Sequence, residues 1–287
     1  MNRKILVAGA TGYLGYYMVQ ELKKRNYWVR VLIRKEIQKE KFKNINVDEF
    51  FVGEITKPDT ITNVTKDINW VFSSIGITRQ KDGFTYMNVD YQGNLNLLND
   101  AEKNNVELFQ YVSVFGSEKV PKLKIIQAKE KFVEALKNSK LNYSIIRPTG
   151  YFGDMKEVLQ MAKSGKVYLI GTGEYKINPI SGQDLAVVCS DSLENKQQIV
   201  NVGGPKVYSQ NQVAEIAFDA LGIKGRIIHI PLWIRDIVVF IVRTFTSSKF
   251  YGPIEFFLTA MTIDGSTDKF GKDLLEDFYN EEAKKIK

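Results

Sequence analysis

The stretch Lys4-Ile-Leu-Val-Ala-Gly-Ala-Thr-Gly-Tyr-Leu-Gly15 decides the fold of this chain of 287 residues. Its apolar run from Ile5 to Ala8 predicts a buried parallel strand, and an amphipathic helix is expected to begin near Gly12. In a strand–turn–helix unit, spaced glycines allow a tight turn, close approach of the backbone to a phosphate and close packing of helix on strand. The start of the helix offers unpaired N–H groups to a pyrophosphate. The stretch therefore predicts a dinucleotide-binding loop rather than a glycine-rich turn that only packs.

The spacing of the glycines points to one group of dinucleotide-binding proteins. The motif Gly9-Ala-Thr-Gly-Tyr-Leu-Gly15 has the form G-x-x-G-x-x-G, not the G-x-G-x-x-G of most dehydrogenases. It resembles the extended and atypical short-chain dehydrogenase/reductase family. The resemblance implies that the cofactor contacts the loop at Gly9, Thr11, Gly12, Tyr13, Leu14 and Gly15.

Composition sets the limits of the interpretation. With 44% hydrophobic and 25% charged residues, the chain has the make-up of a globular protein. The single Cys189 excludes an internal disulfide, and one cysteine with one histidine leaves no usual metal-ligand cluster. The chain enters a core strand almost at once, so we expect no cleavable leader and a cytoplasmic location. The net charge of +7 is spread over scattered lysines, which indicates a solvated surface and no nucleic acid partner.

Strands and helices alternate through the first half of the chain. We expect strands at Trp28–Ile33, Val47–Val52, Asn69–Ser74, Leu108–Val114 and Tyr143–Pro148, a short helix from Thr56, and long helices at Asn88–Asn104 and Ile125–Ser139. This alternation with short connections predicts an α/β fold, a doubly wound parallel Rossmann-type sheet in residues 1–150. The rhythm becomes irregular after residue 150, so residues 151–287 are expected to form a smaller C-terminal substrate lobe on the strand ends, interleaved with the first domain.

The end of the second strand bears on the choice of cofactor. Arg34 and Lys35 stand where an acidic residue would hold the ribose 2′-hydroxyl of NAD(H), whereas an arginine accommodates a 2′-phosphate. Two surface charges are the alternative, and the nearby Glu36 favours it. The pattern favours NADP(H) over NAD(H).

Later strand ends supply further candidate contacts. Small residues at Ser73, Ser74 and Gly76 would let the backbone approach the cofactor, although a plain β-turn would use the same residues. By strand alternation Ser113 points away from its apolar neighbours and could reach a substrate. Pro148, at the end of the sixth strand, completes the predicted contacts.

The residues that usually carry catalysis in this family are incomplete. The family acts through Tyr-x-x-x-Lys, in which the tyrosine is the acid and the lysine holds the nicotinamide ribose. Here Lys129 occupies the lysine position, but Ile125 stands one turn earlier and cannot donate a proton. Lys129 is the candidate catalytic and cofactor-binding residue; a solvated lysine is the alternative. Tyr111 is expected to be a packed aromatic, and His229 to lie in a strand or the core.

Five segments narrow the resemblance. They are Ala128–Phe132, Ser144–Phe152, Pro179–Ala186, Gly203–Pro205 and Phe270–Phe278. In this order they look like the divinyl chlorophyllide 8-vinyl reductase branch, within the group similar to NmrA and isoflavone reductases. That branch also tends to lack the tyrosine, and it reduces a carbon–carbon double bond.

The resemblance implies an NADPH-dependent reductase of an apolar, conjugated small molecule, reducing C=C or C=O by hydride transfer. The alternative is a non-catalytic NADP(H)-binding protein, which would be a redox sensor or an assembly factor. The missing tyrosine supports this alternative equally well. Either is expected to be a monomer or homodimer.

Two apolar stretches close the chain. Pro231–Thr244 and Pro253–Met261 are too short or too charged for a membrane span, so core packing is expected. The alternatives are amphipathic helices that line an apolar cavity or rest on a membrane surface. A capping box at Ser209 and Gln212 predicts a helix to about Leu221, and the charged Asp277–Lys287 predicts a surface helix.

Overall fold

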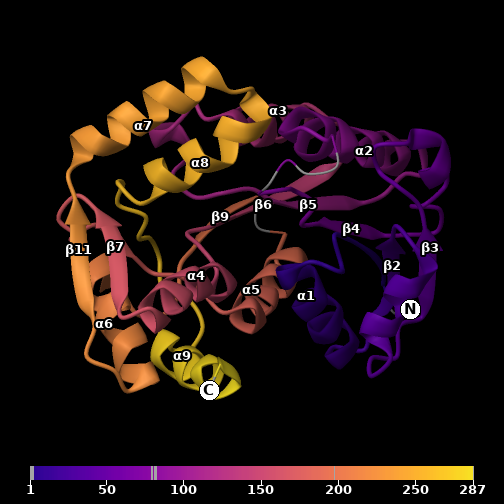
Figure 1. Ribbon diagram of the computed structural model, residues 1–287. Coiled ribbons are helices and arrows are strands. Elements are labelled where there is room, and N and C mark those ends of the chain that lie inside the picture. Colours follow the sequence, from indigo (N-terminus) through magenta and orange to yellow (C-terminus); the bar gives the residue numbers. More distant parts are fainter. Residues whose placement is uncertain (1–2, 79, 81–82, 197, 287) are drawn as a thin grey trace. The chain divides into compact units, whose positions relative to one another are not determined.

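The structure is a computed structural model that describes residues 3–78, 80, 83–196 and 198–286. Its main element is a seven-stranded sheet in the order β3-β2-β1-β4-β5-β6-β9 (Figure 1). The strands are β1 (Lys4–Ala8), β2 (Trp28–Ile33), β3 (Glu49–Val52), β4 (Trp70–Ser73), β5 (Leu108–Val112), β6 (Asn142–Pro148) and β9 (Ile199–Val202). Every pair from β3 to β6 is parallel. The predicted doubly wound Rossmann-type sheet is confirmed.

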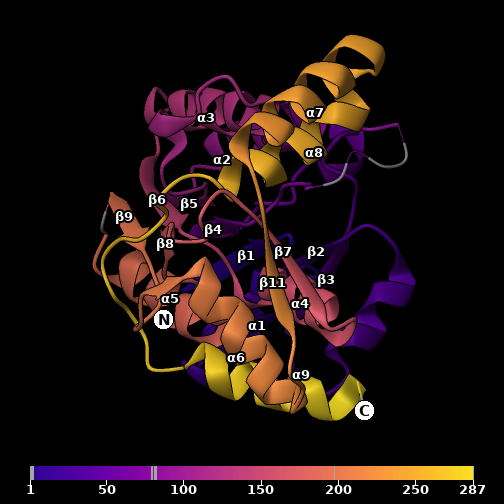
Figure 2. The same ribbon diagram turned by 60° about the vertical axis from the view of Figure 1, so that its left-hand side comes forward.

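Helices cover both faces of this sheet. In Figures 1 and 2, α2 and α3 lie on one face and α1 and α5 on the other. Their bounds are α1 (Tyr13–Lys24), α2 (Asn94–Lys103), α3 (Lys124–Lys137) and α5 (Gly182–Glu194). Short turns of helix join them at η1 (Glu36–Phe42), η2 (Pro58–Ile61), η3 (Met87–Gly93) and η4 (Ser117–Lys119). The inner strands β1, β2, β4 and β5 are buried from both sides, as expected for apolar runs without alternation, whereas the edge strands β3 and β9 are partly exposed.

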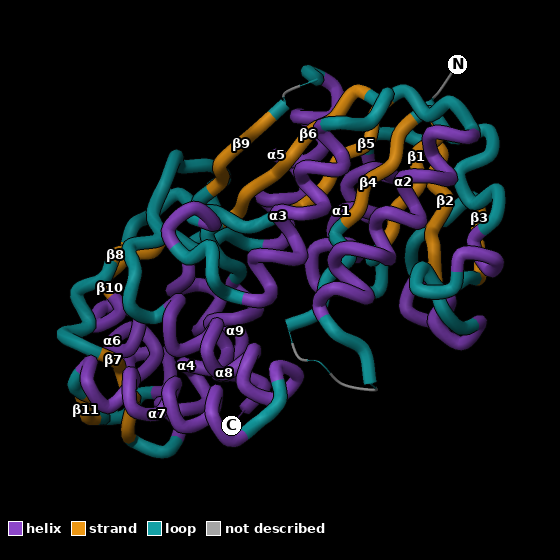
Figure 3. The backbone as a smooth tube through the Cα atoms, turned by 90° about the horizontal axis from the view of Figure 1, so that it is seen from above, coloured by secondary structure: helices purple, strands orange, loops and turns teal. Residues whose placement is uncertain are grey.

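The strand order reverses between β1 and β4, which lie side by side although β2 and β3 stand between them in sequence (Figure 3). In the register of this pair, Ala8 lies opposite Ser73 at the carboxyl end. Ligands of open α/β sheets bind outside the carboxyl ends of the strands at such a reversal. The fold thus places the glycine stretch at the edge where a dinucleotide binds.

By its internal contacts the chain divides into two units. The first consists of residues 1–147 and 185–200, and the second of residues 148–184 and 201–287. Residues 185–200 are held to the first unit by buried polar contacts: Gln110 Nε2 donates to the Cys189 carbonyl (3.1 Å), and the Ser144 and Ser192 hydroxyls are 2.9 Å apart. The predicted division into residues 1–150 and 151–287 remains a prediction.

The second unit combines helices with two small sheets. Its elements are α4 (Phe152–Lys163), β7 (Lys166–Ile170), β8 (Lys176–Ile177), β10 (Tyr208–Ser209), α6 (Gln210–Leu221), β11 (Arg226–Ile230), α7 (Leu232–Phe245), α8 (Ser248–Ala260) and α9 (Leu275–Ile286). The predicted capping box at Ser209 and Gln212 is confirmed. The charged C-terminal helix is amphipathic: Leu275 and Tyr279 are buried in a core shared with α4 and α6.

The expected core packing of the two apolar stretches in this unit was wrong, whereas the expected strand position of His229 is confirmed. Helix α7 does not pack into a core, because none of its residues is buried. Only Gly252 and Glu255 of α8 are buried. His229 does lie in a strand, β11, but it is exposed, and its Nε2 is 2.9 Å from Asn211 Oδ1.

Within the described ranges, no helix combines the length and apolar character needed to cross a bilayer. The same residues contain no group of three or more His, Cys, Asp or Glu side chains that could hold a metal ion. Cys189 is a buried free thiol.

Candidate functional site

The glycine loop is closed by backbone contacts that only glycine allows. Gly9 has φ +83°, and a Cβ there would lie 2.9 Å from Ser74 Oγ. The Gly12 N–H donates to the Gly9 carbonyl at 2.9 Å. At Gly15 a Cβ would lie 2.2 Å from the same carbonyl oxygen. The loop therefore has the tight turn and the close helix packing that its spacing predicts.

The first turn of α1 is open to an anion. Gly12 caps the helix in an extended conformation without a side-chain cap, and no acidic residue stands in the first turn. The backbone N–H groups at a helix start lack intrahelical acceptors, which suits a pyrophosphate. Of the predicted loop contacts, Thr11 and Tyr13 are half-buried, while Leu14 and Gly15 are buried.

A lysine that the sequence reading missed reaches this loop. Lys41, on η1, donates from Nζ to the Thr11 carbonyl oxygen at 2.6 Å. The same Nζ lies 5.3 Å from the centre of the Tyr16 ring. Its charge is thereby held beside the glycine loop. No sequence motif marks Lys41, because its position depends on how η1 folds back from β2.

Arg34 and Lys35 follow β2 directly and are exposed. The Gln38 side-chain carbonyl accepts from their two backbone N–H groups, at 2.8 and 3.1 Å, and so turns the chain into η1. The Arg34 side chain is 62% exposed and lies 4.0 Å from Glu54 Oε2. An ion pair this long and this exposed binds weakly, so an incoming phosphate can displace it.

At the end of β4, the predicted residues Ser73, Ser74 and Gly76 have different structural roles. The Ser73 hydroxyl is fully buried and donates to Asn94 Oδ1 at 2.6 Å, so its side chain is structural. Ser74 continues the sheet through its N–H to the Ala8 carbonyl (3.1 Å) and lies against Gly9. Gly76 is exposed and lies beside Lys129 and Asp90. Gly9, Ser74 and Gly76 thus connect the glycine loop to Lys129.

Lys129 is held by a buried carboxylate. Its Nζ lies 3.0 Å from Asp90 Oδ1, and the side chains are 13% and 0% exposed. The other Asp90 oxygen accepts from the Ile77 backbone N–H at 3.1 Å. Burial raises the pKa of the Asp90 carboxyl, and the Lys129 charge opposes this shift. Lys129 is therefore a fixed cation rather than a solvated surface lysine.

The predicted helix Asn88–Asn104 begins with an irregularity that places Asp90. Residues Met87–Gly93 form a π-helical turn before α2. Asn94, fully buried, donates from Nδ2 to the Asp90 carbonyl at 2.9 Å and accepts from Ser73. π-Turns are often found at functional sites. The sequence reading missed Asp90, since a single acid in a predicted helix looks like a solvated residue.

Tyr111 has two roles. Its ring packs edge-on against Phe132, with centroids 4.6 Å apart, as expected of a buried aromatic. Its hydroxyl, however, lies 3.4 Å from Lys129 Nζ. Burial raises the pKa of Tyr111 to about 12, against the effect of the Lys129 charge. Ile125, where the family has its tyrosine, is only 5% exposed.

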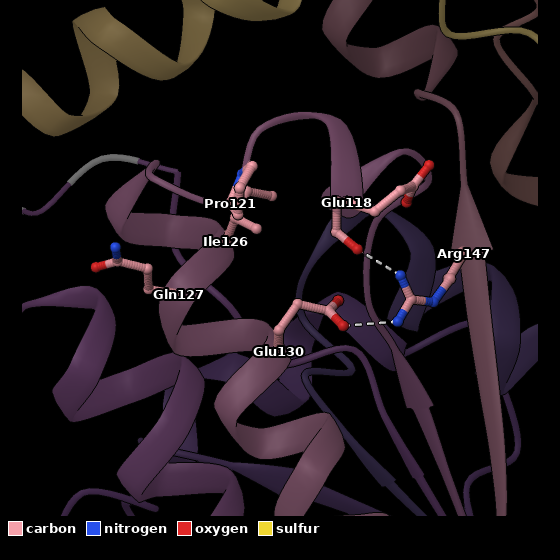
Figure 4. Close-up of a pocket in the computed structure, with 7 residues that line it drawn as sticks. Glu118, Pro121, Ile126, Gln127, Glu130 and Arg147 are labelled. Atoms are coloured by element: carbon pink, nitrogen blue, oxygen red, sulfur yellow. Dashed lines mark hydrogen bonds and ion pairs between the residues drawn. The ribbon is translucent and has the colours of Figure 1, made fainter.

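A pocket of about 260 Å³ opens beside α3 within the first unit (Figure 4). Arg147 donates to Ser117 Oγ at 2.5 Å and to Glu130 Oε2 at 2.7 Å. Ser113 donates to the other Glu130 oxygen at 3.0 Å, so its hydroxyl is engaged by Glu130. Ile126 adds an apolar wall. Pro148, the last residue of β6, belongs to the second unit.

These features define an NAD(P)H-binding protein built on a Rossmann-type sheet. A family described as NAD(P)H-binding matches residues 9–196, most of the chain. The chain belongs to this family, among the atypical short-chain dehydrogenase/reductases of the NmrA-like group. The predicted resemblance is thus confirmed.

Known relatives agree with this assignment. The chain is 30% identical over 320 residues to divinyl chlorophyllide a 8-vinyl-reductase of Cucumis sativus, covering 97% of this chain and 75% of the relative. It is 28% identical over 233 residues to the photosystem II assembly factor Ycf39 of Guillardia theta, covering 79% and 73%. The NADPH-dependent quinone oxidoreductase QOR2 of Escherichia coli, solved with NADPH, has a TM-score of 0.74 at 15% identity, covering 98% and 99%, and so shares the fold.

Proposed function

We propose that this protein is an NADPH-dependent reductase of an apolar, conjugated small molecule, acting on a C=C or C=O bond. The observation that carries the proposal is the buried Asp90–Lys129 ion pair beside Gly76. A buried charge pair is costly to desolvate and adds little net stability. Its position near the glycine loop supports a use for it, and we infer that Lys129 contacts the nicotinamide ribose of a bound cofactor.

The residues around the loop fit an NADP(H) molecule. Gly9, Gly12 and Gly15 leave the backbone bare for a pyrophosphate at the start of α1. Arg34 offers a planar guanidinium group to a 2′-phosphate, and Lys41 adds a charge at the loop. When bound, the cofactor supplies the hydride.

The reaction also requires that the chain orient the substrate and that a proton reach the reduced bond. Ile125 has no proton to give, and the Tyr111 hydroxyl is fully buried. Asp90 neutralises Lys129 and holds it as a ligand for the ribose hydroxyl groups. We assign the proton to solvent or to Lys129. The pocket lined by Ile126, Glu130 and Arg147 is our proposed location for a polar part of that substrate.

The test is NADPH oxidation with a panel of enones and divinyl tetrapyrroles. Lys129→Met should lower kcat/KM by about a hundredfold, because a displaced cofactor loses its reactive geometry. Lys131→Met, an exposed position two residues along the same helix, is the matched control and should leave the rate unchanged. Wild-type protein that oxidises no NADPH with any member of the panel would count against a reductase.

A second candidate is a non-catalytic NADP(H)-binding redox sensor or assembly factor. Two observations favour it: the buried Ile125 at the tyrosine position, and relatives named as photosystem II assembly factors. Tight NADPH binding without turnover, together with a partner whose affinity differs between NADPH and NADP+, would establish it. We rank it second because a buried ion pair is costly to desolvate, and a role in catalysis would account for it.

A further inference from the structure

Helix α7 presents an aromatic ridge to solvent. The ridge consists of residues whose exposed fractions are high for such side chains: Trp233 (62%), Ile237 (49%), Phe240 (68%), Ile241 (47%) and Phe245 (78%). Their spacing of three, four and eight residues brings them to one side of the helix. Monomeric proteins rarely expose contiguous apolar surface of this kind without a binding use.

Helix α8 adds to the apolar surface. Phe250 and Phe257 are 60% and 49% exposed and stand seven residues apart, two helical turns on the same side. Figures 1 and 2 show α7 and α8 side by side. The helical pair therefore exposes large aromatic side chains from both of its members.

The charges of this helical pair are arranged for a surface of low polarity. Arg235 pairs with Asp236 at 2.7 Å, and Arg243 pairs with Glu255. Both acidic groups between residues 232 and 260 are thus neutralised, and Lys249 gives the segment a net charge of +1. The whole chain carries +7. Such a surface is attracted to anionic headgroups and meets no unpaired carboxylate on this segment.

We propose that the aromatic ridge of α7, with the exposed phenylalanines of α8, rests on the surface of a membrane containing anionic lipids. With 14 residues, α7 is about 21 Å long, too short to cross a bilayer but suited to lying in its interface. A ridge fits acyl chains, which adapt to its shape. The positive charge of the segment and of the whole chain favours an anionic surface over a second copy, which would carry the same +7 charge. The inference does not depend on the proposed reductase activity.

The experiment is flotation of the full chain with vesicles of phosphatidylcholine, with or without a quarter of phosphatidylglycerol. We expect binding to the anionic vesicles, with a blue shift of tryptophan emission, and at least tenfold weaker binding to the neutral ones. The double variant Trp233→Ser, Phe240→Glu should lose at least about tenfold in affinity. Its residues are exposed, so NADPH binding and thermal unfolding should be unchanged.

The matched control is Ile37→Glu, which changes an equally exposed apolar residue (72%) on η1 and should bind vesicles like the wild type. Three results would overturn the proposal. The wild type fails to float with anionic vesicles, the double variant floats as well as the wild type, or both vesicle types bind equally. A lipid-free dimer that the double variant abolishes would instead assign the ridge to a second copy of the chain.

Discussion

Gly76 and Lys129 approach each other so closely that no side chain fits between them. A Cβ built on Gly76 would lie 2.8 Å from Lys129 Nζ, and 2.6 Å from the Asp90 oxygen that pairs with it. The glycine is therefore required by the ion pair and not by its own backbone angles. The clash involves side-chain atoms and no backbone atom, so the fold can survive a substitution that the site cannot.

We accordingly expect Gly76→Ala to fold normally but to bind NADPH at least about tenfold more weakly, a change of about 1.4 kcal/mol. Calorimetric titration and thermal unfolding measure the two properties. Gly150→Ala is the control, since no described atom lies within 4 Å of a Cβ at that position. Equal affinities of the Gly76 variant and the wild type would show that the position of Lys129 does not matter for the cofactor.

Removal of the guanidinium group after β2 should change cofactor selectivity. Arg34→Ala should weaken NADPH binding by about tenfold or more, because charge-assisted hydrogen bonds contribute roughly 1.5–3 kcal/mol and this side chain is largely exposed. NADH, which lacks the 2′-phosphate, should bind as before. Lys41→Ala should also weaken NADPH binding.

Arg226→Ala, which removes an exposed arginine from the second unit, controls for the loss of overall positive charge. Dissociation constants for NADPH and NADH, measured at one fixed salt concentration, test this prediction. If the Arg34 variant weakens NADPH and NADH alike, Arg34 is only a surface charge.

The hydroxyl of Tyr111 offers a milder test of the same site. Tyr111→Phe keeps the ring that packs on Phe132 and removes only the contact to Lys129 at 3.4 Å. A hydrogen bond of about 0.5–1.5 kcal/mol corresponds to a roughly two- to tenfold loss of NADPH affinity. Because the pKa of Tyr111 is about 12, the effect should be constant between pH 6 and 9. An effect that appears only above neutral pH would point to tyrosinate chemistry instead.

The buried thiol predicts a loss of stability in alkali. Burial raises the pKa of Cys189 above its ordinary value of 9.0. Above pH 9 the unfolded thiol ionises while the folded one keeps its proton, so the folded state binds more protons and the free energy of unfolding falls. At pH 10 the loss is about 1.4 kcal/mol from this group.

Denaturant unfolding of wild type and Cys189→Ala at pH 8 and pH 10 measures this contribution. The alanine variant is less stable at both values because of the cavity it leaves, but the difference should narrow at pH 10. Curves that stay parallel between the two pH values would exclude the thiol as the cause.

Much of the fold is readable from the sequence because its signals are local. The buried run of Trp28–Ile33 matches the observed strand residue for residue, and the glycine loop has the predicted geometry. Of the site, Lys129 was found by its place in a motif. Asp90 was missed because its pairing joins residues 39 apart through two packed elements, and nothing local marks a buried acid.

For helix α7 the sequence predicted burial wrongly, because its local signal is strong but does not determine its surroundings. Helices rich in aliphatic and aromatic residues normally pack inside a protein, so their composition predicts burial. Trp233 and Phe240 stand outside instead. Composition indicates how much free energy an element gains when its apolar surface leaves water, but not which surface it packs against.

The return of residues 185–200 to the first unit has a consequence for synthesis on the ribosome. Domains fold as their residues emerge, yet here the contact partners of Gln110 and Ser144 leave the exit tunnel only after the first segment of the second unit, residues 148–184, has been made. Until then β6 is an open sheet edge, the kind of edge that recruits foreign strands. Nascent chains of this protein are therefore most in need of a chaperone between translation of residues 148 and 200.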